Sequence, residues 1–173
     1  ERLQLIFNAL DAMSRKAAIP FVIPLHPRTR KMLSGYPELN DKLSSNVMIK
    51  MIAPASYLDM IALESNAEMI ITDSGGVQKE AYYFKKPCII LQNETPWVEL
   101  VENGCAMLAD ADPERMEKAF QLFRSTAGNL HYPEVFGDGH AAEFTISQIV
   151  QYISPRTKSR SEEHTSELQS LRH

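Results

Sequence analysis

The sequence predicts an α/β fold in which a Rossmann-like parallel sheet carries helices on both faces. Short apolar runs begin near residues 20, 47, 68, 88 and 105, and segments with helical spacing separate them. Runs without polar alternation are typical of parallel strands buried on both faces. Parallel strands need right-handed crossover connections, which these intervening segments supply. We therefore expect five parallel strands in one domain that spans residues 1–155.

The composition limits the function classes that this chain can belong to. The 173 residues are 44% hydrophobic and carry a net charge of −4, whereas a nucleic-acid-binding domain normally has a basic surplus. No apolar run approaches the ~20 residues of a membrane-spanning helix. We expect a cytoplasmic protein that binds neither nucleic acid nor membrane. Cys88 and Cys105 lie in apolar runs, which favour core packing over a disulfide or metal site.

Both ends of the sequence differ from those of a typical complete protein. Glu1 begins directly in a helical pattern without an initiator methionine, as if the chain were cut from a larger protein. The last residues are polar and unpatterned, and 160–170 resemble a translated sequencing adapter. We expect residues 156–173 to form a disordered, non-native tail, with a native disordered tail as the alternative. His164 and His173 are therefore left out of the candidate ligands.

The first half of the chain contains two predicted strands between two predicted helices. Apolar side chains recur at helical spacing in residues 1–18. The apolar runs at 20–25 and 47–52 predict strands. Ser56, followed three residues later by an acidic side chain, predicts the start of a helix over 57–65. The side chains expected to face the core in these helices are Leu3, Ile6, Phe7, Leu10, Met13, Leu58, Ile61, Ala62 and Leu63.

The second half continues the same alternation. Gly104 suits the end of a short helix over 98–102, and Asp112-Pro113 provides an N-cap with proline at the first helical position. That next helix is expected to reach about residue 125, and a final helix is expected over 140–152. The predicted strands are 69–71, 88–91 and 105–108, and the predicted inward side chains of the helix after Pro113 are Met116, Phe120 and Phe123.

The turn after the strand near residue 70 suits a phosphate. Ser74, Gly75 and Gly76 stand between this strand and a helical segment. The two glycines allow a ligand to approach the backbone closely, and the N-terminus of a helix attracts anions. The alternative is a turn that only connects a strand to a helix. Asp73 would repel a phosphate, so we interpret it as a turn or capping residue.

Three polar side chains follow on the predicted helix. Glu80 lies six residues beyond Ser74, or about one and two-thirds helical turns. From there its carboxylate would reach past a phosphate and accept hydrogen bonds from both hydroxyls of a ribose, unless it is an ordinary surface glutamate. Gln78 and Lys79 are expected to face solvent.

The loops after the remaining strands carry further candidates. His26 and Arg28 follow the first strand, where open α/β sheets bind ligands, and a guanidinium pairs well with phosphate oxygens. A solvated basic turn, with His26 bonded to a backbone carbonyl, is the alternative. The loop from Pro54 to Tyr57 could receive a base. Residues 93–97 follow the fourth strand, and we expect all these loops to converge on one edge of the sheet.

Three motifs in this order resemble the non-hydrolysing UDP-N-acetylglucosamine 2-epimerase family: LHPRTR, TDSGGVQKEA and NETPWVELVENG. The resemblance covers residues 1–153 and implies the C-terminal half of a two-domain glycosyltransferase-B fold. It implies a cytoplasmic isomerase of cell-surface polysaccharide biosynthesis, homodimeric at full length and without a metal ion or NAD. UDP would be eliminated to give a 2-acetamidoglucal and added back with opposite configuration at C2, which interconverts UDP-N-acetylglucosamine and UDP-N-acetylmannosamine.

The resemblance also implies roles for individual residues. His26 would be catalytic and would stabilise the charge on the departing diphosphate. The acid and base carboxylates would lie in an N-terminal domain that is absent, so we expect no turnover by this chain alone. The residues implied to bind UDP are Arg28, Pro54, Tyr57, Ser74, Gly75, Gly76 and Glu80.

The last motif departs from the pattern of many members of that family. Gln92 and Trp97 stand where those members carry arginines, and a subgroup with a Glu-Thr-Glu-Trp motif resembles Glu94-Thr95-Pro96-Trp97 more closely. Such a subgroup would act on modified UDP-sugars, such as diacetamido-uronic acids. The same motifs would also suit a hydrolysing 2-epimerase of the sialic-acid type, a UDP-sugar glycosyltransferase domain, or a nucleotide-sensing domain without chemistry.

Overall fold

The computed structural model describes residues 1–153, and the chain divides into two units between Pro133 and Glu134. Residues 141–153 of the second unit are helical, in agreement with the helix predicted over 140–152. The predicted tail at 156–173, with His164 and His173, lies outside the described residues.

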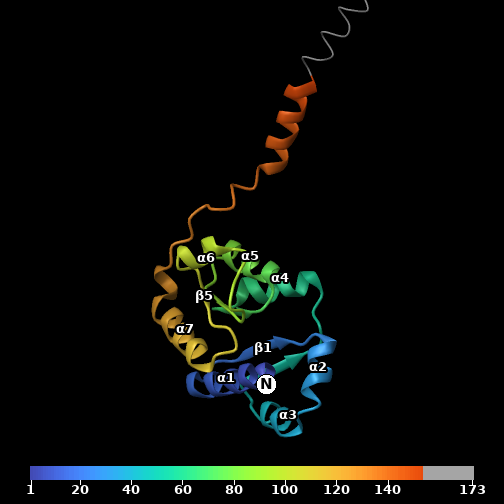
Figure 1. Cartoon of the computed structure of the whole chain (residues 1–173), viewed down its shortest axis with the longest axis vertical. Helices are drawn as coiled ribbons and strands as arrows, with labels where there is room; N and C mark the ends of the chain where they lie inside the picture. The colour runs from blue at the N-terminus through green and yellow to red at the C-terminus, as the bar shows by residue number, and fades with distance from the viewer. Residues whose placement is uncertain (154–173) are drawn as a thin grey trace, which may run out of the picture. The chain divides into compact units, whose positions relative to one another are not determined.

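The first unit contains the predicted helices and strands in the predicted order, with two further helices between the first two strands (Figure 1). All five expected strands are present, each within a few residues of its predicted start. The elements are α1 (Arg2–Ala17), β1 (Phe21–Pro24), α2 (Pro27–Leu33), α3 (Pro37–Ser44), β2 (Ile49–Ile52), α4 (Tyr57–Asn66), β3 (Ile70–Thr72), α5 (Gly75–Tyr83), β4 (Cys88–Ile90), α6 (Val98–Glu102), β5 (Ala106–Leu108), α7 (Pro113–Thr126) and a 3₁₀ turn (Ala127–Asn129).

Every strand pair is parallel, which confirms the predicted fold class. The strands form two hydrogen-bonded ladders, β1–β2 and β3–β4–β5. One apolar core joins them, since Phe21 of β1, Ile89 of β4 and Phe120 of α7 belong to the same cluster. The helices α5 and α7 both pack against β4, and α1 lies beside α7 (Figure 1). The helices that carry the candidate site residues, α2, α4 and α5, each follow the carboxyl end of a strand.

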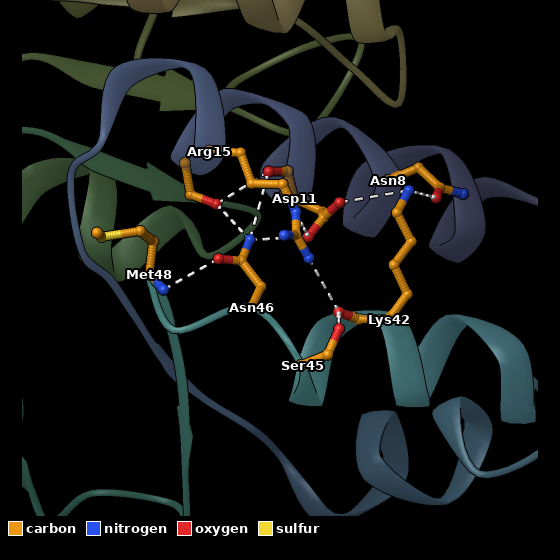
Figure 2. A network of polar contacts seen from close by, with 8 residues as sticks. Asn8, Asp11, Arg15, Lys42, Ser45, Asn46 and Met48 are labelled. Carbon is orange, nitrogen blue, oxygen red and sulfur yellow. Dashed lines mark hydrogen bonds and ion pairs between the residues drawn. The ribbon is translucent and has the colours of Figure 1, made fainter.

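A buried polar network fastens α1 to the segment before β2 (Figure 2). Asp11 is 2% exposed and accepts hydrogen bonds from Asn46 Nδ2 at 2.7 Å and from Arg15 Nε at 3.0 Å. Lys42 Nζ lies 3.3 Å from its other carboxylate oxygen. Asn46 also donates to Ser14 Oγ at 2.9 Å, so nearly every polar atom at this contact has a partner.

The helices α2 and α3 are not indicated by the sequence pattern. That pattern predicts a loop after His26, whereas Pro27 begins α2 and Pro37 begins α3. Proline is favoured at the first helical position because that residue has no intrahelical donor bond to lose. Only Leu33, Leu39 and Leu43 are buried in these two short helices, so the apolar periodicity is weak.

Helix α4 starts at the predicted residue but buries a different face. Ser56 Oγ accepts a hydrogen bond from the Asp59 amide at 3.3 Å, as the capping pattern indicates. The prediction that Leu58 faces the core is wrong, since its side chain is 76% exposed, and Ala62 is also exposed. The buried residue is Glu64, because α4 packs against α5 along the side that carries it.

Candidate functional site

The turn between β3 and α5 is held in shape by local hydrogen bonds. The Ser74 amide donates to Thr72 Oγ1 at 3.0 Å, and the Gln78 amide donates to the Ser74 carbonyl at 3.1 Å. The Ser74 side chain makes no capping hydrogen bond, and Ser74 and Gly76 are exposed. The first amides of a helix lack intrahelical partners, so this exposed helix start can receive an anion.

The two glycines of this turn are not required by the fold itself. Neither Gly75 nor Gly76 has a positive φ. A Cβ atom on Gly75 would meet Trp97 Nε1 at 3.7 Å, and one on Gly76 would meet Ser74 Oγ at 3.8 Å, both ordinary van der Waals distances. What the missing side chains provide is bare backbone at the helix start, where a ligand can approach closely.

The loop after β4 is bonded to the same helix through Gln78. Thr95 Oγ1 donates to Gln78 Oε1 at 2.6 Å, and Gln78 Nε2 donates to Gln92 Oε1 at 3.3 Å. The prediction that Gln78 faces solvent is wrong, because its side chain is fully buried. Its amide can be buried because both of its ends are hydrogen-bonded to the loop.

Trp97 completes the contact between this loop and α5. Its ring N–H donates to the Gly75 carbonyl at 2.8 Å, and its backbone amide donates to Thr95 Oγ1 at 3.1 Å. Lys79 Nζ lies 4.4 Å from the centre of the indole ring, so Lys79 is half-buried instead of solvent-facing as predicted. The predicted convergence of the 93–97 loop with the Ser74–Gly76 turn is confirmed.

The predicted ribose carboxylate has a second carboxyl group as its neighbour. Glu80 is half-buried on α5, and Glu64 of α4 is 4% exposed with no hydrogen-bond partner for either carboxylate oxygen among the described residues. Burial first, and then the neighbouring Glu80 carboxyl group, raise the pKa of Glu64 to about 7. Sequence reasoning missed Glu64, because an acidic side chain on a helix normally faces solvent and Glu64 lies off the face that Leu58, Ile61 and Ala62 indicated.

The β1 and β2 loops form another group of predicted site residues. His26 is the exposed N-cap of α2, and its Nδ1 accepts a hydrogen bond from the Arg28 amide at 3.2 Å. The alternative in which His26 bonds a backbone carbonyl is therefore wrong, and a neutral His26 carries its proton on Nε2. Arg28 is exposed. Arg30 Nη2 donates to the Ile52 carbonyl at 3.1 Å, which ties the start of α2 to the end of β2.

The remaining predicted residues lie on the loop that follows β2. Pro54 is exposed, and Tyr57, the first residue of α4, is 69% exposed. Within residues 1–153 no hydrogen bond or ion pair joins His26, Arg28, Pro54 or Tyr57 to the Ser74–Gly76 turn or to Glu80. Hydrogen bonds join the loop that carries Thr95 and Trp97 to α5, and one bond of Arg30 joins the start of α2 to the end of β2.

The part of the chain that the structure describes contains no group of three or more His, Cys, Asp or Glu side chains arranged to hold a metal ion. None of its helices has the length and hydropathy needed to cross a membrane. Both cysteines are free and buried, and burial raises the pKa of Cys88 to about 12.

Known proteins are similar to this chain in sequence and in fold. A UDP-N-acetylglucosamine 2-epimerase homolog of Methanococcus maripaludis is 41% identical over 142 residues, which is 82% of this chain and 38% of that protein. UDP-2,3-diacetamido-2,3-dideoxy-D-glucuronate 2-epimerase of Pseudomonas aeruginosa is 35% identical over 88% of this chain and 40% of its own length. The structure of Methanocaldococcus jannaschii UDP-GlcNAc 2-epimerase in complex with UDP-GlcNAc and UDP matches with a TM-score of 0.76 and 39% identity, over 87% of this chain and 41% of that one.

The chain spans about two fifths of the length of the curated relatives that it matches. The family model described as UDP-N-acetylglucosamine 2-epimerase matches residues 1–153, the same range that the three motifs indicated. The chain belongs to the UDP-N-acetylglucosamine 2-epimerase family.

Proposed function

We propose that this chain is the UDP-holding, C-terminal half of a cytoplasmic, non-hydrolysing UDP-sugar 2-epimerase. The observation that carries the proposal is the exposed start of α5, where bare glycine backbone is supported by the Trp97–Gly75 hydrogen bond. The solved relative bound to UDP-GlcNAc and UDP supports a nucleoside diphosphate as the ligand. The full-length protein would interconvert UDP-N-acetylglucosamine and UDP-N-acetylmannosamine, as a homodimer, to supply cell-surface polysaccharide synthesis.

In this proposal the candidate residues contact UDP, which is the leaving group. The amides of Gly75 and Gly76, with the positive end of α5, hold the diphosphate. Glu80 accepts hydrogen bonds from the ribose hydroxyls, and His26 donates its Nε2 proton toward the charge that develops as the bond to the sugar breaks. Arg28 adds a positive charge, and Pro54 and Tyr57 border the uracil. No metal ion or NAD is needed for elimination and re-addition.

The step at C2 lies outside this chain. Abstraction of the C2 proton requires a carboxylate base, which we assign to the part of the protein that precedes residue 1. The 173-residue chain alone is therefore expected to bind UDP without turnover. Epimerisation by this chain without added protein would contradict the assignment.

The UDP site is tested by calorimetric titration of UDP into the 173-residue chain and its Glu80→Ala variant. Loss of the hydrogen bonds to the Glu80 carboxylate should weaken the binding free energy by about 1.5–3 kcal/mol. The affinity of Glu80→Ala for UDP should therefore be about 10- to 100-fold lower than that of wild type. Glu68→Ala is the matched control, because Glu68 is an exposed carboxylate before β3, away from the carboxyl end of that strand. Unchanged affinity in Glu80→Ala would remove Glu80 from the site.

A second candidate function is epimerisation of a diacetamido-uronic acid carried on UDP. The similarity to the Pseudomonas aeruginosa enzyme favours it, as does a loop whose Gln92 and Trp97 are bonded to α5 and supply no cation. Product analysis with the full-length protein separates the candidates: the UDP-sugar that is converted identifies the substrate. A released free sugar would instead indicate a hydrolysing enzyme, and a transferred sugar a glycosyltransferase.

A further inference from the structure

Glu64 is a buried carboxyl group to which the proposed mechanism gives no role. Its side chain is 4% exposed, and neither carboxylate oxygen has a donor among the described residues. A buried ionised carboxylate without donors is strongly unfavourable, so such a group keeps its proton instead.

Among the described residues, the titratable groups that act on Glu64 from neighbouring elements are Glu80 and Cys88, and neither is a cation. Helix α5 presents Glu80, whose carboxylate disfavours ionisation of Glu64. Strand β4 presents Cys88, and burial together with the charge of Glu64 raises the pKa of this thiol to about 12. Cys88 is therefore neutral near pH 7, and Glu80 is the charged partner of Glu64.

The two carboxyl groups can share one proton in a hydrogen bond. Between two ionised carboxylates no hydrogen bond forms, because both are acceptors only. One proton on the more buried group turns it into a donor, and burial together with the charge of Glu80 raises the pKa of Glu64 to about 7. The protonated pair satisfies a Glu64 oxygen that otherwise has no partner.

We infer that Glu64 is a positioning residue for the ribose contact: its protonated carboxyl group donates a hydrogen bond to Glu80 and fixes the Glu80 carboxylate toward the nucleotide. This inference rests on the proposed UDP site. A carboxylate has about four lone-pair sites, so one bond from Glu64 leaves Glu80 free to accept two ribose hydroxyls. Loss of the Glu64 proton removes the bond and places a second negative charge beside the first. The affinity for the nucleotide therefore falls as the pH rises through neutrality.

The test is the pH dependence of UDP-N-acetylglucosamine binding to the 173-residue chain, wild type against Glu64→Gln. This ligand is chosen because a terminal phosphate ionises near pH 6, whereas the diphosphate between two sugars has no ionisation in this range. The wild-type affinity should fall by about tenfold between about pH 6 and pH 8.5, which corresponds to a change of one unit in the Glu64 pKa on binding. Glu64→Gln keeps a donor that does not titrate, so its affinity should stay near the wild-type value at pH 6. Comparison of the two removes the contribution of other titrating groups.

Three further measurements separate positioning from a merely structural role. Glu64→Met fills the space without a donor and should bind weakly at every pH, although its melting temperature matches or exceeds that of the wild type. An analogue whose ribose lacks both hydroxyls should bind wild type and Glu64→Gln with the same pH dependence. A ¹³C titration of the Glu64 carboxyl group should give a midpoint near pH 7 in the free chain.

The outcomes distinguish this inference from the proposed UDP site. If wild type binds no UDP-N-acetylglucosamine, or if Glu80→Ala binds as tightly as wild type, the proposed ribose contact is wrong, and the positioning role is wrong with it. If Glu80 matters but wild type and Glu64→Gln share one pH profile, only the positioning role is wrong. A ¹³C midpoint below about pH 5, as for an ordinary glutamate, overturns the shared proton whatever the ligand does.

Discussion

Two carboxyl groups of this chain are almost equally buried and yet have opposite properties. Asp11 is 2% exposed and Glu64 is 4% exposed. Burial opposes the ionisation of Asp11, but hydrogen bonds from Asn46, Arg15 and Lys42 outweigh it and lower the pKa of this carboxyl group. Glu64 has no such donor, so burial and the charge of Glu80 raise its pKa to about 7.

The difference shows that partners, and not depth alone, decide what a buried carboxyl group does. The Asp11 network joins α1 to α3 and to the start of β2, with no predicted ligand contact among its members, and its role is to hold the fold (Figure 2). The Glu64–Glu80 pair lies between α4 and α5, and one member is a predicted ligand contact. A buried carboxyl group with several donors stays ionised, whereas one without donors keeps its proton to a higher pH, and a pKa perturbed in this way is a pointer to a functional site.

The largest change in stability is expected from Asp11→Asn, which removes the ionised member of the Asp11 network. The substitution removes the charge that compensates Arg15 and Lys42 and places a second amide group beside that of Asn46. Breaking a buried ionic network is strongly destabilising, and partial exposure of both cations reduces the effect to about 3 kcal/mol of unfolding free energy. Urea unfolding at pH 7 measures it. Asp41→Asn, an exposed carboxylate on α3, is the control and should change stability by less than about 0.5 kcal/mol.

The second prediction contrasts the pH dependence of the two groups. The pKa of Glu64 is about 7 in the folded chain against 4.5 unfolded, so the folded state binds more protons between these values. Its stabilising contribution is complete below about pH 4.5 and is lost as the pH rises through 7, to a total of about 3 kcal/mol. Glu64→Gln should therefore gain stability relative to wild type as the pH rises from about 4.5 to 8.

Asp11 should act in the opposite direction in the same urea series. Its pKa is lowered on folding, so its stabilisation is present above about pH 4 and is lost as the pH falls below the unfolded value. The difference between wild type and Asp11→Asn should shrink as the pH falls below about 4, whereas Glu64→Gln should gain on wild type between about pH 4.5 and 8 and not beyond. Parallel curves for the two variants would contradict the distinction between the groups.

The sequence predicted the parts of this structure that depend on local pattern. Continuous apolar runs located all five strands, and capping residues such as Asp112 located helix starts, because both signals act within a few residues. The turn at Ser74–Gly76 and its contact with the loop that carries Trp97 were predicted because parallel strands bring their following loops to one edge of a sheet.

The sequence did not indicate which polar side chains are buried by distant partners: the prediction for Gln78 was wrong, and none was made for Asp11 or Glu64. Gln78 is buried because Thr95 and Gln92 bond its amide, and Asp11 because Asn46 lies 35 positions further along the chain. A glutamate in a helix usually faces solvent, and neither the pattern of α4 nor its propensity indicates that Glu64 is covered by α5. Such burial is decided by tertiary packing, which single-sequence periodicity does not contain.

The smallest change in stability is expected from removing Lys42, the exposed charged partner of Asp11, in contrast to removal of the buried partner Asn46. Lys42 is 46% exposed and lies 3.3 Å from the carboxylate, so Lys42→Met should lower stability by only about 0.5 kcal/mol, as for other solvent-screened ion pairs. Asn46 is 2% exposed and bonds Asp11 at 2.7 Å, and its side-chain oxygen accepts from the Met48 amide at 3.0 Å. Asn46→Ala leaves these buried groups without partners and should lower stability by about 2 kcal/mol. Asp11 should also titrate at a higher pH in Asn46→Ala than in Lys42→Met, by carboxyl ¹³C measurement. The reverse order would mean that surface charge, and not the buried amide, distinguishes Asp11 from Glu64.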